Sequence, residues 1–150
     1  MRKVMLLCCF TALLLIGAST TSSNPELSSG RSADEAAVRA TVNDYIQAYY
    51  TADPARMERA LHPHYLKHTI SGPEGAARMT EKTGLQMVQA ARAHVRSSGA
   101  IDSKLAKVTV LDVDHDIASA KLVTSEWVDY LMLTKSDRKW RIVSVVLREQ

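Results

Sequence analysis

The feature that most constrains the fold is the two-residue periodicity of apolar side chains in the last part of the chain. Successive side chains on a strand point to opposite faces, and strands this close in sequence pair as antiparallel neighbours. We therefore expect a meander of short strands at Leu105–Asp112, Ile117–Val123, Trp127–Lys135 and Lys139–Leu147. The pattern leaves open whether Thr124–Glu126 is a turn or a bulge.

A long amphipathic helix is expected ahead of these strands. Apolar residues recur there with helical spacing, at Val38, Val42, Tyr45, Ile46 and Tyr49. This spacing predicts a helix over roughly Ala33–Thr51. Ser32 and Glu35 have the spacing of a capping box, which favours a helix start at this point. The Ser-rich segment 23–32 is expected to be a flexible linker.

Two further helices are expected between the long helix and the meander. Asp53-Pro54 is favoured at a helix start and predicts a short helix that ends at His62-Pro63. A short strand is expected over Leu66–Ile70, and a third helix over Thr80–Arg92. The inward residues of this third helix are expected to be Leu85, Val88 and Ala91. Three helices followed by a meander predict an α+β fold with the helices on one face of the sheet.

The N-terminus has the order of a secretory signal peptide. Arg2 and Lys3 supply positive charge, and an apolar run over Val4–Ile16 is followed by small and polar residues. The run is shorter than the roughly 20 residues that span a bilayer, which argues against an uncleaved anchor. We predict a signal peptide over residues 1–22, a periplasmic or secreted location without membrane association, and one domain over residues 33–150.

The composition argues against several classes of function. Both cysteines, Cys8 and Cys9, lie in the predicted signal peptide, so the mature domain is expected to fold without disulfides. The net charge of +3 falls to near +1 without Arg2 and Lys3, and no Lys/Arg run occurs, so nucleic-acid binding is not indicated. No Gly-rich phosphate loop, Ser-His-Asp constellation or nucleophilic cysteine is recognisable, and no cofactor is predicted.

The last two expected strands are apolar on both faces. In the final strand, simple alternation places Trp140, Ile142 and Val146 on one face and Val143, Val145 and Leu147 on the other. An antiparallel sheet with one face in water alternates more cleanly between apolar and polar residues. We therefore expect the outer face to be covered, most simply by a second copy of the chain in a homodimer.

The order of the elements and several local sequences resemble a known superfamily. The segments that carry the resemblance are Tyr45–Asp53, Arg59–Pro63, Trp127–Leu133 and Lys139–Val143. Together they resemble the nuclear transport factor two-like (SnoaL-like) superfamily, and within it the branch described as "putative lumazine-binding". The resemblance covers roughly residues 33–147 and implies a cone-shaped fold, in which three N-terminal helices and a curved antiparallel sheet enclose a pocket. It also implies dimerisation through the outer face of the sheet.

Asp129 is the main candidate for chemistry. It shares strand parity with Trp127 and Leu131, so its carboxylate is expected among apolar side chains, where desolvation raises the pKa. Such a group suits a general base, as the pocket carboxylates of ketosteroid isomerase and scytalone dehydratase, relatives in fold, imply. The alternative is a structural pair with an Arg or a backbone N–H. If Ser136–Arg138 forms the hairpin loop, Asp129 lies opposite Val145 and has no cation across the strands.

Aromatic side chains are expected to complete the site. The predicted ligand-binding residues are Tyr45, Tyr49, Tyr65, Trp127 and Asp129. Trp127 is placed to stack on a planar ligand near the pocket mouth, whereas Tyr45 and Tyr49 are better explained as the buried face of the first helix. His64 and Tyr130 are the candidates for a catalytic acid. The family branch commonly has an acidic residue where this chain has His64, so a role that needs a carboxylate there is not expected.

Three histidines raise the question of a metal site. His62, His64 and His68 have the even spacing that places side chains on one face of a strand, and three histidines can form an open zinc site. Pro63 interrupts the segment, however, and no cysteine or nearby acidic ligand completes the set. No metal site is therefore predicted.

Three functions remain open on this reasoning. The leading hypothesis is an exported domain that binds a small molecule, with a planar heteroaromatic compound as one possible ligand. The second is an isomerase, dehydratase or cyclase that uses Asp129 as general base. The third is a dimeric interaction module with a vestigial pocket.

Overall fold

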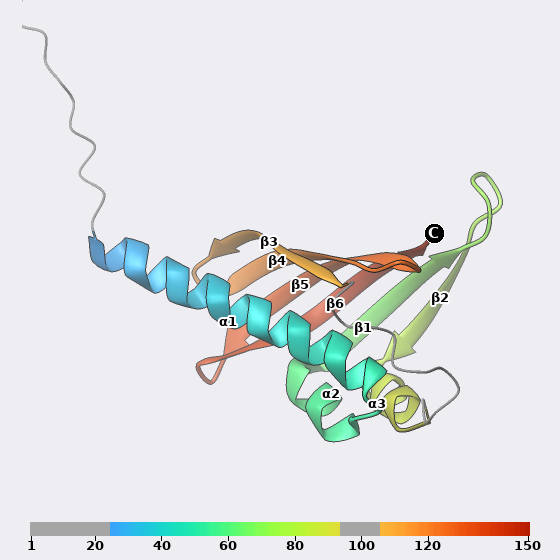
Figure 1. The fold of residues 1–150 in the computed structure, drawn as a ribbon, viewed down its shortest axis with the longest axis horizontal. Coiled ribbons are helices and arrows are strands. Elements are labelled where there is room, and N and C mark those ends of the chain that lie inside the picture. The colour runs from blue at the N-terminus through green and yellow to red at the C-terminus, as the bar shows by residue number, and fades with distance from the viewer. Residues whose placement is uncertain (1–24, 94–105) are drawn as a thin grey trace, which may run out of the picture.

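The computed structural model describes residues 25–93 and 106–150, so the predicted signal peptide lies outside the described residues. Its elements are α1 (Pro25–Tyr50), α2 (Pro54–Ala60), β1 (Leu61–Ser71), β2 (Arg78–Thr83), α3 (Gly84–Ala93), β3 (Lys107–Asp114), β4 (Ile117–Val123), β5 (Trp127–Ser136) and β6 (Lys139–Glu149). Figure 1 shows α1 lying along one face of a curved sheet, with α2 and α3 near one end of that face. The predicted α+β class is confirmed.

The sheet has six strands in the order β2-β1-β6-β5-β4-β3. The expected meander forms one side of it, because β3, β4, β5 and β6 pair in sequence as antiparallel neighbours. The expectation of a purely antiparallel sheet is wrong, because β1 pairs with β6 in parallel. Strand β1 follows directly after α2 and pairs with the edge of β6 that β5 does not occupy. Strand β2 then pairs with β1 as an antiparallel hairpin and extends the sheet.

The first helix starts earlier than expected. It begins at Pro25, a residue that is favoured in the first turn of a helix, and it therefore includes most of the segment expected to be a linker. Ser32 lies inside the helix, so the predicted capping box is wrong. Arg31 links these added turns to their surroundings through ion pairs with Glu35 (3.3 Å) and with Asp112 on β3 (3.0 Å).

The second helix begins where the sequence predicts. Asp53 is its N-cap, and its side chain accepts a hydrogen bond of 2.9 Å from the backbone N–H of Arg56. The helix ends at Ala60, just before the expected His62-Pro63 boundary, because Leu61 is already extended. The strand that follows is longer than the expected Leu66–Ile70 segment and includes Pro63.

The expected third helix over Thr80–Arg92 is wrong at its N-terminal end. Residues 78–83 pair with β1 as strand β2, so the helix starts only at Gly84, after a capping box at Thr83. The backbone N–H of Thr83 donates to Gln86 Oε1 (2.8 Å), and the backbone N–H of Gln86 donates to Thr83 Oγ1 (3.4 Å). Leu85, expected to be inward, is 68% exposed, whereas Met87 and Ala91 are buried.

The register of the last hairpin differs from the expected one by two residues. The turn contains only Asp137 and Arg138, both with positive φ (51° and 60°), and a bulge leaves Val143 without a partner on β5. Asp129 therefore lies opposite Leu147, not Val145. The bulge also reverses the alternation, so Val145 is buried with Ile142 while Val146 is exposed on the outer face.

The core lies between α1 and the inner face of the sheet. Its largest fully buried side chains are those of Val38, Val42, Ile46, Met57, Leu122, Leu131, Leu133, Ile142, Val145 and Asp129.

The connection between β4 and β5 is a turn and not a bulge within one strand. The hydroxyl of Thr124 accepts hydrogen bonds in this turn from the backbone N–H groups of Glu126 and Trp127. Within residues 25–93 and 106–150, no helix is long and apolar enough to cross a membrane.

Candidate functional site

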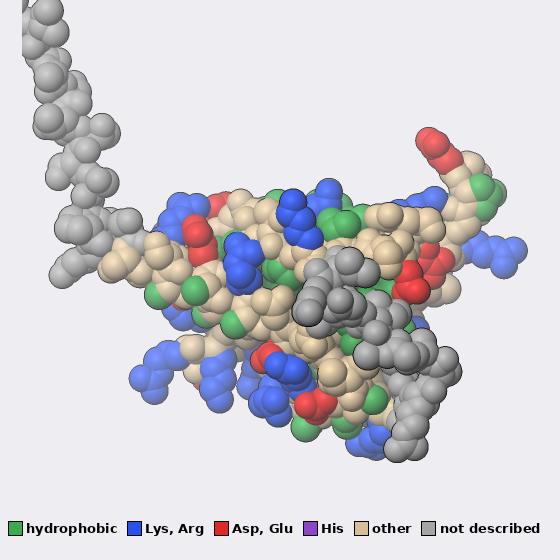
Figure 2. Space-filling model, in the orientation of Figure 1, with side chains coloured by type: hydrophobic (Ala, Val, Ile, Leu, Met, Phe, Trp, Pro, Cys, Tyr) green, Lys and Arg blue, Asp and Glu red, His purple; other side chains and the backbone are tan. Residues whose placement is uncertain are grey.

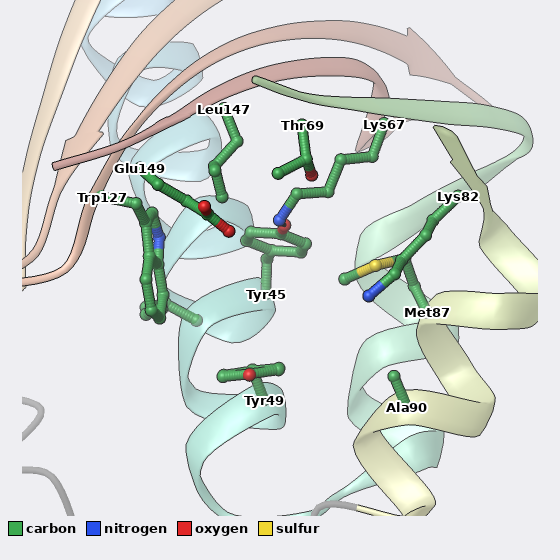
Figure 3. A pocket seen from close by; sticks show the side chains of 11 residues that line it. Tyr45, Tyr49, Lys67, Thr69, Lys82, Met87, Ala90, Trp127, Leu147 and Glu149 are labelled. Carbon is green, nitrogen blue, oxygen red and sulfur yellow. Dashed lines mark hydrogen bonds between the residues drawn. The ribbon is translucent and has the colours of Figure 1, made fainter. Parts of the chain in front are cut away.

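A cavity of about 170 Å³ lies between α1, α3 and the inner face of the sheet. Figure 3 shows side chains around this space, which come from α1, α3, β1, β2, β5 and β6. The helices contribute Tyr45, Ile46, Tyr49, Met87 and Ala90, and the strands contribute Lys67, Thr69, Lys82, Trp127, Leu147 and Glu149. The site therefore depends on residues that the fold brings together from widely separated parts of the chain.

Aromatic side chains form one wall of the cavity. Of the predicted ligand-binding residues, Tyr45, Tyr49 and Trp127 line it. The Trp127 ring meets the Tyr49 ring edge to face, with centroids 5.9 Å apart, and lies 6.3 Å from the Tyr50 ring. These contacts fix the orientation of Trp127 and leave an apolar, polarizable surface for a ligand.

Asp129 is fully buried beside the cavity and does not line it. Its neighbours across the strands are Leu122 and Leu147, and neither carboxylate oxygen accepts a well-aligned hydrogen bond from a described residue. Burial raises its pKa from 3.8 to about 6, while Lys67 and the nearby indole N–H of Trp127 act in the opposite direction. That N–H is close enough to affect the pKa, but its geometry falls short of a hydrogen bond.

Lys67 is the functional candidate that sequence reasoning missed. Its residue is only 9% exposed, and its Nζ donates a hydrogen bond of 3.1 Å to the hydroxyl of Tyr45. Burial lowers the pKa of Lys67, and the opposing effect of Asp129 does not cancel it. Lys67 follows the buried Tyr65 by two residues on β1 and so shares its face, but the expected strand began at Leu66 and did not include Tyr65.

The two buried tyrosines remain protonated over the physiological range. Burial raises the pKa of both Tyr45 and Tyr65, and the charge of Asp129 raises both further. Tyr65 lies beside the cavity rather than in its wall. The arrangement thus combines neutral hydroxyl groups with one buried carboxyl group and one buried amine.

The two candidates for a catalytic acid lie away from the cavity, which is a correction to the sequence-based expectation. His64 is exposed on β1, and its backbone N–H donates to His62 Nδ1 at 3.1 Å. Tyr130 is exposed on the outer face of the sheet, with Lys121 Nζ 5.2 Å from its ring centroid. Strand parity explains Tyr130, because it is adjacent to the inward-pointing Asp129.

The histidines do not converge on a common point. His68 forms a pair of 3.2 Å with Glu81 on β2, whereas His62 and His64 contact each other. Among the described residues, no group of three His, Cys, Asp or Glu side chains is arranged to hold a metal ion.

On the face shown in Figure 2, Lys and Arg side chains lie in separate groups with acidic side chains among them.

Comparison with protein families gives a match over residues 33–148 to the family described as "Putative lumazine-binding". The chain belongs to this family. The match includes α1 from Ala33 onward and the strands that form the cavity wall, except for Glu149 at the end of β6. No curated protein matches the sequence.

Solved structures show the same fold. An NTF2-like protein from Silicibacter pomeroyi is 20% identical with a TM-score of 0.63, over 79% of this chain and 98% of that one. An NTF2-like protein from Shewanella baltica is 17% identical with a TM-score of 0.63, over 79% and 95%. A ketosteroid isomerase-like protein from Erwinia carotovora atroseptica is 11% identical with a TM-score of 0.50, over 77% and 95%. The predicted superfamily and branch are therefore confirmed.

Proposed function

We propose that this lumazine-binding family domain binds a small planar heteroaromatic molecule in the cavity beneath α1. One observation supports the proposal most directly. The aromatic side chains of Tyr45, Tyr49 and Trp127 line the same cavity as the buried amine of Lys67. Ligand sites commonly combine an apolar aromatic lining with a few fixed polar groups. The aromatic wall suits the faces of a flat ring, and the Lys67 amine suits a polar atom on its edge.

The charged side chains around the cavity narrow the class of ligand further. Lys67 and Lys82 line it together with one carboxylate, Glu149. Two amines facing one acid favour a ligand with an electron-rich oxygen, such as a ring carbonyl or an ionised hydroxyl. Ring carbonyls of this kind are found in lumazine, after which the family is described.

Tryptophan fluorescence provides the test. We expect lumazine to quench Trp127 and to raise the melting temperature, because a ligand that binds only the folded state stabilises it. Trp127→Phe should remove the quenching, whereas Trp140→Phe is the matched control, since Trp140 packs against α1 and its indole donates to Asp34 (3.0 Å) instead of lining the cavity. Absence of both quenching and thermal stabilisation across lumazine, flavin and pterin probes would contradict the proposal.

Proton transfer by Asp129 is a second candidate function, favoured by its pKa of about 6. A carboxyl group that titrates near neutrality suits general acid–base catalysis. Incubation with an enolisable ketone in D₂O measures proton abstraction directly. We expect deuterium incorporation in the wild type and none in Asp129→Asn if the domain is an enzyme, and binding without incorporation if it is only a binding domain.

We also propose that the protein is exported and forms a homodimer. Export is supported by the signal-peptide order of residues 1–22. A homodimer is supported by the outer face of the sheet, where Ile117, Tyr130, Met132 and Val146 are exposed large apolar residues on adjacent strands. A second copy of this face would remove these side chains from water.

A further inference from the structure

We propose that Lys67 is an amine nucleophile that forms a reversible imine with the carbonyl group of a small aldehyde or ketone held in the cavity. The inference rests on the proposed function, because it uses the same cavity. It goes further by naming carbonyl compounds as the class of ligand and one side chain as the atom that reacts.

The placement of the amine is the first argument. Lys67 lies near the middle of β1, its side chain is almost entirely buried, and its Nζ lines the cavity, held by the Tyr45 hydroxyl at 3.1 Å. Figure 3 shows this Nζ at the Tyr45 hydroxyl, with the amine of Lys82 across the cavity. A buried stem and a fixed hydrogen bond reduce the conformational freedom that an amine loses when it reacts.

The surroundings of Lys67 do not match those of a structural lysine. A buried lysine kept for stability is normally paired with a carboxylate. Among residues 25–93 and 106–150, Lys67 forms no ion pair, and the hydroxyl of Tyr45 is its hydrogen-bond partner. Its neighbour across the β1–β2 ladder is another lysine, Lys82, which is an unfavourable pairing for two charged amines.

The charges facing the amine come from five elements. Tyr45 on α1 and Tyr65 on β1 are neutral, Lys82 on β2 is cationic, and Asp129 on β5 and Glu149 on β6 are acidic. Burial and Lys82 lower the pKa of Lys67, while Asp129 and Glu149 act against them. The net effect is a lowered pKa and a larger fraction of neutral amine, the form in which lysine is a nucleophile.

The reaction needs no oxidant or reductant. The lone pair of the neutral amine attacks the carbonyl carbon, the carbonyl oxygen takes up a proton, and the nitrogen releases one, which gives a carbinolamine. The C–O bond then breaks as the hydroxyl group takes a second proton and leaves as water, while nitrogen loses its other proton to leave the neutral imine. The two protons taken up on oxygen equal the two that nitrogen releases, so the net change is the loss of one water molecule.

Reductive trapping tests the proposal on the full chain. Benzaldehyde forms an imine with a lysine amine, and sodium cyanoborohydride reduces that imine to a stable benzylamine. Peptide mass spectrometry then gives the labelling rate of each lysine. We expect Lys67 to be labelled faster than the exposed Lys139 at neutral pH, because a lowered pKa increases the fraction of neutral amine. Labelling of Lys67 at or below the rate of Lys139 would overturn the proposal.

Variants test its electrostatic basis. Asp129→Asn should speed the labelling of Lys67, because the carboxylate raises the pKa of Lys67, and Lys82→Met should slow it, because Lys82 lowers that pKa. Lys121→Met, on the outer face over Tyr130, is the matched control and should leave the rate unchanged. Labelling rates that change in neither the Asp129 variant nor the Lys82 variant would overturn the proposal.

A binding measurement separates this proposal from the function on which it rests. Thermal shift with lumazine, and with benzaldehyde without reductant, reports occupancy of the cavity whether or not a bond forms. Stabilisation by these probes without a Lys67 adduct would overturn the imine and leave the binding function standing. A specific Lys67 adduct supports the imine, and absence of both adduct and stabilisation contradicts both proposals.

Discussion

Replacement of Asp129 by Asn should change the stability of the protein in a pH-dependent way. The pKa of Asp129 is about 6 in the folded protein, against 3.8 for an unperturbed carboxyl group. Below pH 3.8 the group is protonated in both states and has little effect on stability. As the pH rises from 3.8 to about 6, the unfolded chain ionises while the folded state stays protonated, so the folded state loses stability relative to it.

The size of this effect follows from the two pKa values. A shift of about two pKa units corresponds to about 3 kcal/mol of destabilisation once the pH is above 6. Asn carries no charge and removes this destabilisation, but it also removes the favourable interaction of the Asp129 carboxylate with Lys67. We therefore expect Asp129→Asn to be more stable than the wild type by about 1 to 3 kcal/mol at about pH 8, and by little near pH 4.

Urea unfolding of both proteins near pH 4 and about pH 8 measures this difference. Asp34→Asn is the matched control, because hydrogen bonds from Lys135 (2.6 Å) and Trp140 (3.0 Å) lower the pKa of Asp34. The ionised Asp34 carboxylate stabilises the folded state, and this stabilisation is lost only below pH 3.8. Asp34→Asn should therefore be less stable than the wild type by a similar amount at both pH values. A loss of stability in Asp129→Asn that is equal at the two pH values would refute the reasoning and make Asp129 a structural hydrogen-bonding residue.

Three further predictions concern the rest of the molecule. Thr83→Ala removes the capping box of α3 and should lower the free energy of unfolding by about 1 kcal/mol in urea titrations, whereas an unchanged midpoint would contradict this role. Val146→Lys should yield a monomer in sedimentation, because it places a charge in the proposed dimer face; a monomeric wild type at micromolar concentration would refute the dimer. The mature N-terminus should lie between Ala18 and Ser28 by intact mass of the envelope fraction, and a mass that begins at Met1 would refute cleavage.

Strand parity was enough to predict the burial of Asp129. It is flanked in β5 by Val128 and Tyr130 and shares its face with the buried Leu131, and no bulge interrupts this stretch. The same reasoning predicts a raised pKa, because burial of a carboxylate without a partner disfavours its charged form. The inward position and the perturbed titration of Asp129 are thus local properties of one strand.

The position of Lys67 required information that lies elsewhere in the chain. Lysine is rarely buried, and a short strand over Leu66–Ile70 gives no reason to prefer one face. Its face is decided by pairing with β6 on one side and β2 on the other, at large sequence separation. The bulge at Val143 likewise depends on how β6 packs between β5 and β1, so the pattern in β6 alone gave the wrong face for Val146.

The parallel pairing of β1 with β6 has a consequence for how the chain matures. The strand that follows all others in sequence lies in the interior of the sheet, and the Lys67 and Asp129 strands flank it on either side. Until β6 is available, β1 and β2 have no sheet to join, and the cavity lacks Leu147 and Glu149. Pairing across such a sequence distance is slow to form. A chain with this order of strands therefore cannot complete its sheet or its cavity until the last strand of the domain has been synthesised.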